Sequence, residues 1–232
     1  MRQALLRRDH RPVLRQLLAR ALPGAASESI ERLAEDARVT IVRPGDVIFR
    51  QGEPIPVTLV IHGHAALRRT TWDGRELVLA IAKSGCLFGW GIAGQAASAD
   101  LVALTSTEVG LWSGADVREL VATDPGLAVG VIDGMGRNIV AISQRIDGFI
   151  HQDARGRVLR VLAEHRDLFF GESPVLSRTL LPGLVGTSRE MTGRVIRGLE
   201  REGMIARIGR RGLRLLSPTG LEEAADPALR AS

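Results

Sequence analysis

Three polar residues stand close together near the C-terminal end of the chain: Arg189, Glu190 and Arg194. Arginine can pair bidentately with guanine, and glutamate can accept a hydrogen bond from cytosine N4. This set of side chains could therefore read base edges in the major groove of DNA.

The segment that carries them, Thr187 to Arg201, is predicted to form a helix. Apolar side chains recur at helical spacing along one face, and they are Met191, Val195, Ile196 and Leu199. The polar residues fall on the other face, as in the recognition helix of a helix-turn-helix protein, which reads bases with its N-terminal residues. An alternative is that Thr187 and Glu190 only form a capping box and that the arginines are solvated.

The composition of the chain favours DNA as the partner. The chain has 232 residues, enough for one large or two small domains, and a formal net charge of +5. Lys83 is its single lysine, so nearly all basic charge is arginine, the side chain suited to bidentate recognition of phosphate and guanine. Thirteen arginines face six acidic residues between Ala154 and Leu216, and the remainder is slightly acidic. A basic C-terminal segment of this kind indicates nucleic-acid binding.

Cysteine content and hydropathy exclude several other classes. Cys86 is the single cysteine, so neither an intrachain disulfide nor a four-cysteine metal cluster can form. We expect Cys86 to be a small packed residue, with a reactive thiol as the alternative. No apolar run is long enough to span a membrane, and the N-terminus lacks the apolar core of a signal peptide. A cytoplasmic protein without a membrane partner is expected.

The N-terminal half changes its hydrophobic period at Val39. Residues 1–38 read as a helical arm broken at Pro23-Gly24. From Val39 to about residue 115, short β-type runs alternate with glycine-rich turns, a pattern typical of a sandwich or barrel. Aromatic content is only 3%, so aliphatic side chains must form the core.

A long helix is predicted within residues 116–152. Asp124 and Pro125 read as an N-cap followed by proline at the first helical position. Apolar residues then alternate spacings of four and three: Ala128, Ile132, Met135, Ile139, Ile142, Ile146 and Phe149. Such a heptad seam is typical of two helices packed along their length. The helix could instead pack on its own β domain, but the regular seam favours a symmetric dimer, with the last six of these residues at the interface.

Residues 153–220 read as a winged helix-turn-helix domain, followed by a tail at 221–232. Asp153 is predicted to cap a helix that runs to His165, and Ser177–Val185 to form the first helix of the DNA-binding pair, with the turn at Gly186. Residues 204–216 read as a β-hairpin with a basic tip, a wing able to touch phosphates. The predicted DNA-binding residues are Arg178, Thr187, Ser188, Arg189, Glu190, Arg194 and Arg210.

This order of elements resembles the CRP/FNR family of bacterial transcription regulators. The most specific match is Val185–Arg194, which is similar to the family's V-G-C-S-R-E-T-V-G-R segment, and Arg43–Asp46 and Asp73–Glu76 resemble turns of its β-roll. The similarity covers about residues 28 to 218. It implies an α+β fold with an antiparallel, cyclic-nucleotide-binding-like and cupin-like β-roll. It also implies a homodimer without enzymatic activity, with double-stranded DNA and RNA polymerase as partners.

By this resemblance, Arg189, Glu190 and Arg194 occupy the base-reading positions of the cyclic-AMP-receptor branch, which reads half-sites like TGTGA. One departure lies in the first helix of the pair, at Pro182-Gly183. A proline in a helix removes a backbone hydrogen bond, so this helix should be kinked or shortened.

The sensor half departs further from the cyclic-AMP branch. The positions that meet ribose, cyclic phosphate and base in that branch are here Trp90, Ala97 and Ile142, with Ser143 beside the last. A buried phosphate needs a cation or oriented donors, and Ala97 supplies neither. Cyclic AMP is therefore not the expected effector. The alternatives are haem or another apolar ligand, or a domain that binds no ligand and serves as a dimer scaffold. No cofactor is predicted.

A second hypothesis is a cupin-type metal enzyme that uses His62 and His64. Residues at i and i+2 of a strand share a face, so the two imidazoles could converge on a metal ion. Against this hypothesis, Leu67 and Arg68 stand where a cupin carries its glutamate, and Gly63 favours a turn. The long helix and the winged motif also have no role in such an enzyme.

Overall fold

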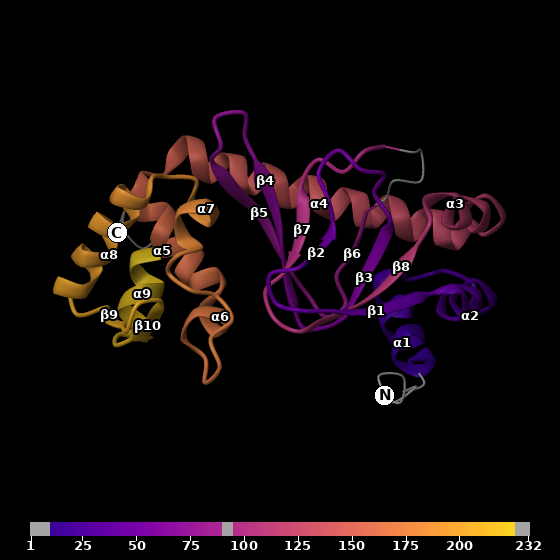
Figure 1. Cartoon of the computed structure of the whole chain (residues 1–232), viewed down its shortest axis with the longest axis horizontal. Coiled ribbons are helices and arrows are strands. Elements are labelled where there is room, and N and C mark those ends of the chain that lie inside the picture. The colour runs from indigo at the N-terminus through magenta and orange to yellow at the C-terminus, as the bar shows by residue number, and fades with distance from the viewer. Residues whose placement is uncertain (1–9, 90–94, 226–232) are drawn as a thin grey trace. The chain divides into compact units, whose positions relative to one another are not determined.

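The structure is a computed structural model that describes residues 10–89 and 95–225 of the chain (Figure 1). The chain forms two compact units. One comprises residues 1–67 and 81–139, and the other comprises residues 68–80 and 140–232. The fold is α+β with antiparallel strand pairs and a C-terminal helix-turn-helix, as the sequence predicts.

Two four-stranded sheets form the β-roll. Their strand orders are β1-β8-β3-β6 and β2-β7-β4-β5. The strands are β1 Arg38–Val42, β2 Val47–Phe49, β3 Val57–His62, β4 His64–Thr70, β5 Glu76–Lys83, β6 Leu87–Phe88, β7 Asp100–Ala103 and β8 Thr107–Trp112. Side chains from both sheets, among them Phe49, Val60, Leu101 and Val109, pack into one buried cluster. The predicted sandwich or barrel is confirmed. Strand β6 has two residues, too few for a periodic pattern to indicate it from the sequence.

Helices cover one side of the first sheet. They are α1 Arg11–Ala21, α2 Ser27–Asp36, α3 Gly114–Thr123 and the beginning of α4 Pro125–His151. Leu14 and Leu18 of α1 join a buried cluster with Trp112, whose Nε1 donates a hydrogen bond of 2.8 Å to the Leu33 carbonyl. The predicted break of the arm at Pro23-Gly24 is confirmed, and residues 1–9 lie outside the described part.

Asp124 joins two helix starts. One carboxylate oxygen accepts from the Leu127 amide at 3.1 Å and thereby caps α4, while the other accepts from the Ala26 amide at 2.8 Å, just before α2. The Ser29 hydroxyl also donates to this carboxylate, and these hydrogen bonds, with that of Ser29 first, hold the pKa of Asp124 below its usual value. The predicted cap is confirmed, and its second function as a tie to α2 emerges only in the structure.

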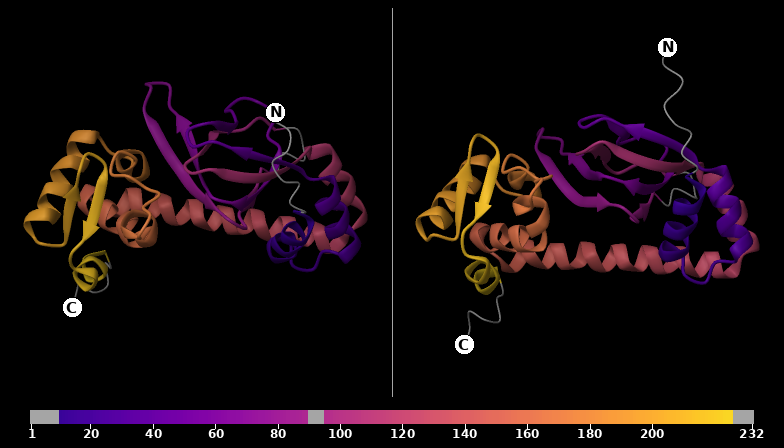
Figure 2. Two further views of the ribbon diagram at one scale, coloured as in Figure 1. Left: turned by 60° about the horizontal axis from the view of Figure 1, so that its bottom comes forward. Right: turned by 90° about the horizontal axis from the view of Figure 1, so that it is seen from below.

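Helix α4 is continuous over 27 residues and appears as one ribbon in Figure 2. Leu127 and Val131 are buried in the first unit, whereas Ile132 and Ile139 are each 65% exposed. The seam continues with Met135, Ile142 and Ile146, which are also exposed. Among the described helices, none combines the length and the apolar character that crossing a bilayer requires.

The second unit contains the DNA-binding fold. Its elements are α5 Ala154–Glu164, α6 Arg166–Phe170, α7 Leu181–Val185, α8 Arg189–Arg201, β9 Ile205–Ile208, β10 Gly212–Leu215 and α9 Pro218–Ala225. Helix α5 packs against α7, α8 and α9, and the buried leucines of this unit include Leu159, Leu162 and Leu199. The predicted cap of α5 is confirmed, since the Asp153 carboxylate accepts from the Gly156 amide at 2.7 Å.

The first helix of the DNA-binding pair is shorter than Ser177–Val185. It begins at Leu181, so the predicted start was wrong by four residues. Pro182 lies in its first turn, where a helix has no partner for the backbone N–H that proline lacks. The expected shortening at Pro182 is thus confirmed. Gly186 ends the helix with φ +65°, as the predicted turn requires.

Candidate nucleic-acid interface and sensor region

Helix α8 presents a polar face to solvent. Its buried residues are Thr192, Ile196 and Leu199, with Met191 and Val195 half-buried beside them. The side chains of Glu190 and Arg194 are 80% and 64% exposed, and Arg189 is exposed as well. The three predicted base-reading residues therefore share the open face of one helix.

The start of α8 is fixed by Ser188. Its Oγ accepts from the Met191 amide at 3.1 Å, and the Thr192 hydroxyl donates to its carbonyl at 3.0 Å. The alternative of a capping box between Thr187 and Glu190 does not apply, because Ser188 is the N-cap and the helix begins two residues after Thr187. Glu190 is thereby free of a capping role.

Glu190 and Arg194 form an ion pair at 3.0 Å, one turn apart on α8. Exposed pairs of this kind contribute only about 0.3–0.5 kcal/mol. Breaking this pair to contact DNA therefore costs little free energy. The Glu190 carboxylate can then accept a hydrogen bond from cytosine, and the Arg194 guanidinium can donate to guanine.

The wing is tied to the rest of the domain by two arginines. The Arg178 backbone N–H donates to the Arg211 carbonyl at 3.0 Å, and its Nε donates to the Arg210 carbonyl at 2.8 Å. Arg207 of β9 pairs with Glu200 of α8 at 2.8 Å. Arg178 thus holds the wing tip, while the Arg210 side chain is exposed there. The predicted hairpin is confirmed by the antiparallel pairing of β9 with β10.

A bidentate pair joins α5 to the end of α8. Arg155 donates to both carboxylate oxygens of Glu202, at 2.9 and 2.6 Å. The hydrogen bond from Arg155 lowers the pKa of Glu202. This pair fixes the end of the recognition helix opposite to the one that carries the base-reading residues.

The predicted effector residues belong to different compact units. Ala97 is buried in the β-roll cluster of the first unit, whereas Ile142 and Ser143 are exposed residues of α4 in the second. Trp90 lies outside the described residues.

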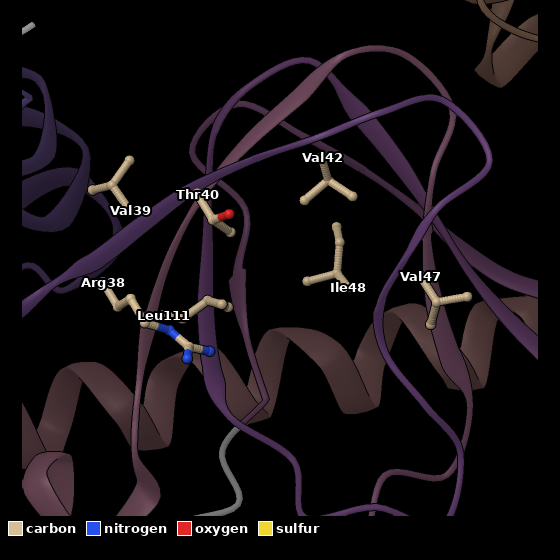
Figure 3. A pocket seen from close by; sticks show the side chains of 7 residues that line it. All are labelled: Arg38, Val39, Thr40, Val42, Val47, Ile48 and Leu111. Carbon is tan, nitrogen blue, oxygen red and sulfur yellow. The ribbon is translucent and has the colours of Figure 1, made fainter. Parts of the chain in front are cut away.

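A hollow of about 490 Å³ opens in the β-roll between β1 and β2 (Figure 3). Its lining combines apolar side chains with Arg38 and Thr40, and consists of Arg38, Val39, Thr40, Val42, Val47, Ile48 and Leu111.

His62 and His64 do not form a metal site in the described part of the chain. They flank Gly63, which turns the chain between β3 and β4 with φ +87°, so they do not share one strand face. Burial, followed by the neighbouring charges of His62 and Lys83, lowers the pKa of His64. Within residues 10–89 and 95–225 no group of three or more His, Cys, Asp or Glu is placed to hold a metal ion.

One cluster behind the end of α7 could not be predicted from local sequence patterns. Arg145, Phe149 and Arg157 contact the end of α7 from other elements. Phe149 differs from the rest of the predicted seam, because its ring packs within the chain, against the position of Gly186. No periodicity reveals such a contact between distant segments.

The fold and the exposed polar face define a helix-turn-helix DNA-binding regulator with a cyclic-nucleotide-binding-type β-roll. The family model for the cyclic nucleotide-binding domain matches residues 39–124, and that for the Crp-like helix-turn-helix domain matches residues 156–224. The chain belongs to the CRP/FNR family of transcription regulators.

Characterised relatives agree with this assignment. The cyclic AMP receptor protein of Thermus thermophilus is 28% identical over 205 residues, which cover 87% of this chain and 94% of the relative. The cAMP-activated global transcriptional regulator Vfr of Pseudomonas aeruginosa is 29% identical over 161 residues, covering 63% of this chain and 74% of Vfr.

The c-di-GMP responsive regulator CLP of Xanthomonas campestris shares the fold, with a TM-score of 0.70 at 24% identity over 83% of this chain and all of that one. The Crp-like helix-turn-helix domain and the transcriptional regulator Vfr support a regulator and not an enzyme, so the cupin hypothesis is not favoured.

Proposed function

We propose that the protein binds DNA as a homodimer and reads a palindromic site with TGTGA-like half-sites. The observation that carries the proposal is the combination of two exposed surfaces. Arg189, Glu190 and Arg194 face solvent on α8, and isoleucines of the α4 seam, such as Ile132 and Ile139, do so as well.

The seam supports the dimer because of its length and chemistry. Contiguous apolar surface on a helix is rarely left in water and marks an interaction site. A second copy of the same helix offers the matching seam at the same spacing. Two recognition helices related by the twofold axis would then meet half-sites about one helical turn apart.

We also propose that cyclic AMP does not control the protein through the contacts used by its cAMP-activated relatives. Ala97 and Ile142 can neither neutralise a phosphate nor hydrogen-bond a base. The charge-assisted hydrogen bonds that are lost contribute about 1.5–3 kcal/mol each to nucleotide binding. The effector is an apolar ligand such as haem, or the domain binds none and serves as a scaffold. RNA polymerase is the expected protein partner.

Selection of bound duplexes from a random pool tests the DNA part of the proposal. The expected product is an inverted repeat whose half-site centres lie about 10 base pairs apart. Enrichment of a single, non-repeated element would contradict the dimeric mode. Titration calorimetry with cyclic AMP tests the effector part. Micromolar binding that also tightens the affinity for the selected duplex would overturn it.

A further inference from the structure

Arg145 of α4 bridges two elements that are distant in the sequence. Its Nη1 donates to the Leu79 carbonyl of β5 at 3.1 Å, and its Nη2 donates to the Leu184 carbonyl of α7 at 2.7 Å. One guanidinium therefore joins the long helix, the β4–β5 hairpin and the first helix of the DNA-binding pair. The hairpin segment 68–80 accordingly belongs to the same compact unit as the DNA-binding fold.

The partly buried charge of Arg145 costs free energy. The Nε of Arg145 is buried and has no hydrogen-bond partner among the described residues. Burial lowers the pKa of Arg145, and the charge of Glu164 offsets this only in part. A buried charge that no carboxylate pairs with contributes little net stability, and an apolar residue of similar size can be equally stable or more so. The contribution of Arg145 therefore lies in holding neighbouring elements in place.

The geometry that Arg145 controls is the C-terminal end of α7. The last carbonyls of a helix lack intrahelical partners. Here the Leu184 carbonyl accepts from Arg145, and the Val185 carbonyl accepts from Arg157 Nε of α5 at 3.1 Å. Both guanidinium groups also lie over the Phe149 ring, at 5.7 and 5.5 Å from its centroid.

The turn that follows α7 packs against the same Phe149 ring. A Cβ added to Gly186 would lie 2.5 Å from Phe149 Cε1, so the backbone of the turn touches the ring. Ser188, which caps α8, follows two residues later. The direction in which α8 starts is therefore set by where α7 ends.

We propose that Arg145 is a positioning residue for DNA binding. It fixes the end of α7 against α4 and β5, and thereby orients the base-reading residues of α8. The proposal rests on DNA reading by α8. It predicts that loss of Arg145 impairs sequence discrimination more than general affinity, because phosphate contacts tolerate a shift that bidentate base contacts do not.

The test compares Arg145→Met, Arg145→Lys and the control Arg137→Met. Methionine keeps the length without the donors, and lysine keeps the charge but cannot span both carbonyls. Arg137 is the matched control, because it is exposed on the same helix and donates a hydrogen bond of 3.4 Å to the Ala21 carbonyl, away from α7. Each variant is titrated with the duplex that the wild-type protein selects and with a shuffled duplex.

We expect Arg145→Met to weaken binding to the selected duplex by about tenfold or more, and Arg145→Lys to do so to a smaller extent. Affinity for the shuffled duplex and the behaviour of Arg137→Met should not change. Equal losses of affinity on both duplexes would mean that Arg145 acts only through its positive charge and would overturn the proposal. Unchanged binding to the selected duplex would overturn it as well.

Amide hydrogen exchange supplies a readout that needs no DNA. In Arg145→Met, exchange should accelerate from Leu184 to Met191 while α1 and α2 keep their wild-type protection. Unchanged protection at the end of α7 would contradict the proposal. Failure of DNA reading itself is distinguishable, because the wild-type protein would then select no duplex while the exchange result still reports on Arg145.

Discussion

Replacing Ile139 by aspartate should separate the protomers of the proposed dimer. Ile139 lies at the centre of the α4 seam, where its side chain is 65% exposed in the single chain. In a twofold dimer the change places one carboxylate from each protomer in the middle of the interface. Neither would have a basic partner in the seam, whose other members are apolar.

The magnitude follows from the burial that the dimer would provide. Burying an isoleucine side chain contributes about 1.5–3 kcal/mol, so two copies lose about 3–6 kcal/mol. Burying an unpaired carboxylate costs several kcal/mol more. Even the low end of this sum, about 6 kcal/mol, weakens dimerisation by roughly four powers of ten. A dimer with a nanomolar dissociation constant would then be largely monomeric at micromolar concentration.

Val140→Asp is the matched control. Val140 is the next residue and is 56% exposed, but it points about 100° away around the helix. Sedimentation velocity at micromolar concentration measures the association state, and circular dichroism verifies that both variants fold. We expect monomers for Ile139→Asp and dimers for Val140→Asp. An Ile139→Asp variant that stays dimeric, or two variants that dissociate equally, would place the interface elsewhere.

Two further predictions concern stability. Gly186→Ala should lower the free energy of unfolding by at least about 1 kcal/mol, because a left-handed residue costs about 1–2 kcal/mol and the new Cβ meets Phe149. The control is Gly203→Ala, at a residue with φ +71° and open space around it, which measures the backbone cost alone in urea titrations. Equal losses of stability in both variants would show that the Phe149 ring moves aside without a free-energy cost. Asp124→Asn should lower the melting temperature at neutral pH. The gap to wild type should close as the pH falls below about 4 and through the lowered pKa of Asp124, and a gap independent of pH would show that the charge contributes nothing.

The local chemistry of the sequence predicted the elements whose signals are short in range. The cap at Asp124, the cap at Asp153 and the turn at Gly186 each depend on neighbouring residues, and each is confirmed. The start of α8 shows the limit of such rules. Thr187 and Ser188 are both able to cap, and only the folded backbone determines that Ser188 accepts from Met191.

Contacts between distant segments could not be predicted in this way. The heptad spacing included Phe149, but its ring packs within the chain because two arginines and Gly186 surround it. The bridge from Arg145 to Leu79 and Leu184 depends on three elements that meet only after folding. The turn at Gly63, which separates His62 from His64, was by contrast predicted from the local sequence.

Base reading by the exposed face of α8 is the central claim, and Arg194→Ala tests it most directly. The variant and the wild-type protein are titrated with the duplex that the wild-type protein selects and with a shuffled duplex, at one salt concentration. The account predicts a loss of about 1–3 kcal/mol on the selected duplex and little change on the shuffled one. An equal loss on both would mean that Arg194 touches only phosphate and would contradict the claim.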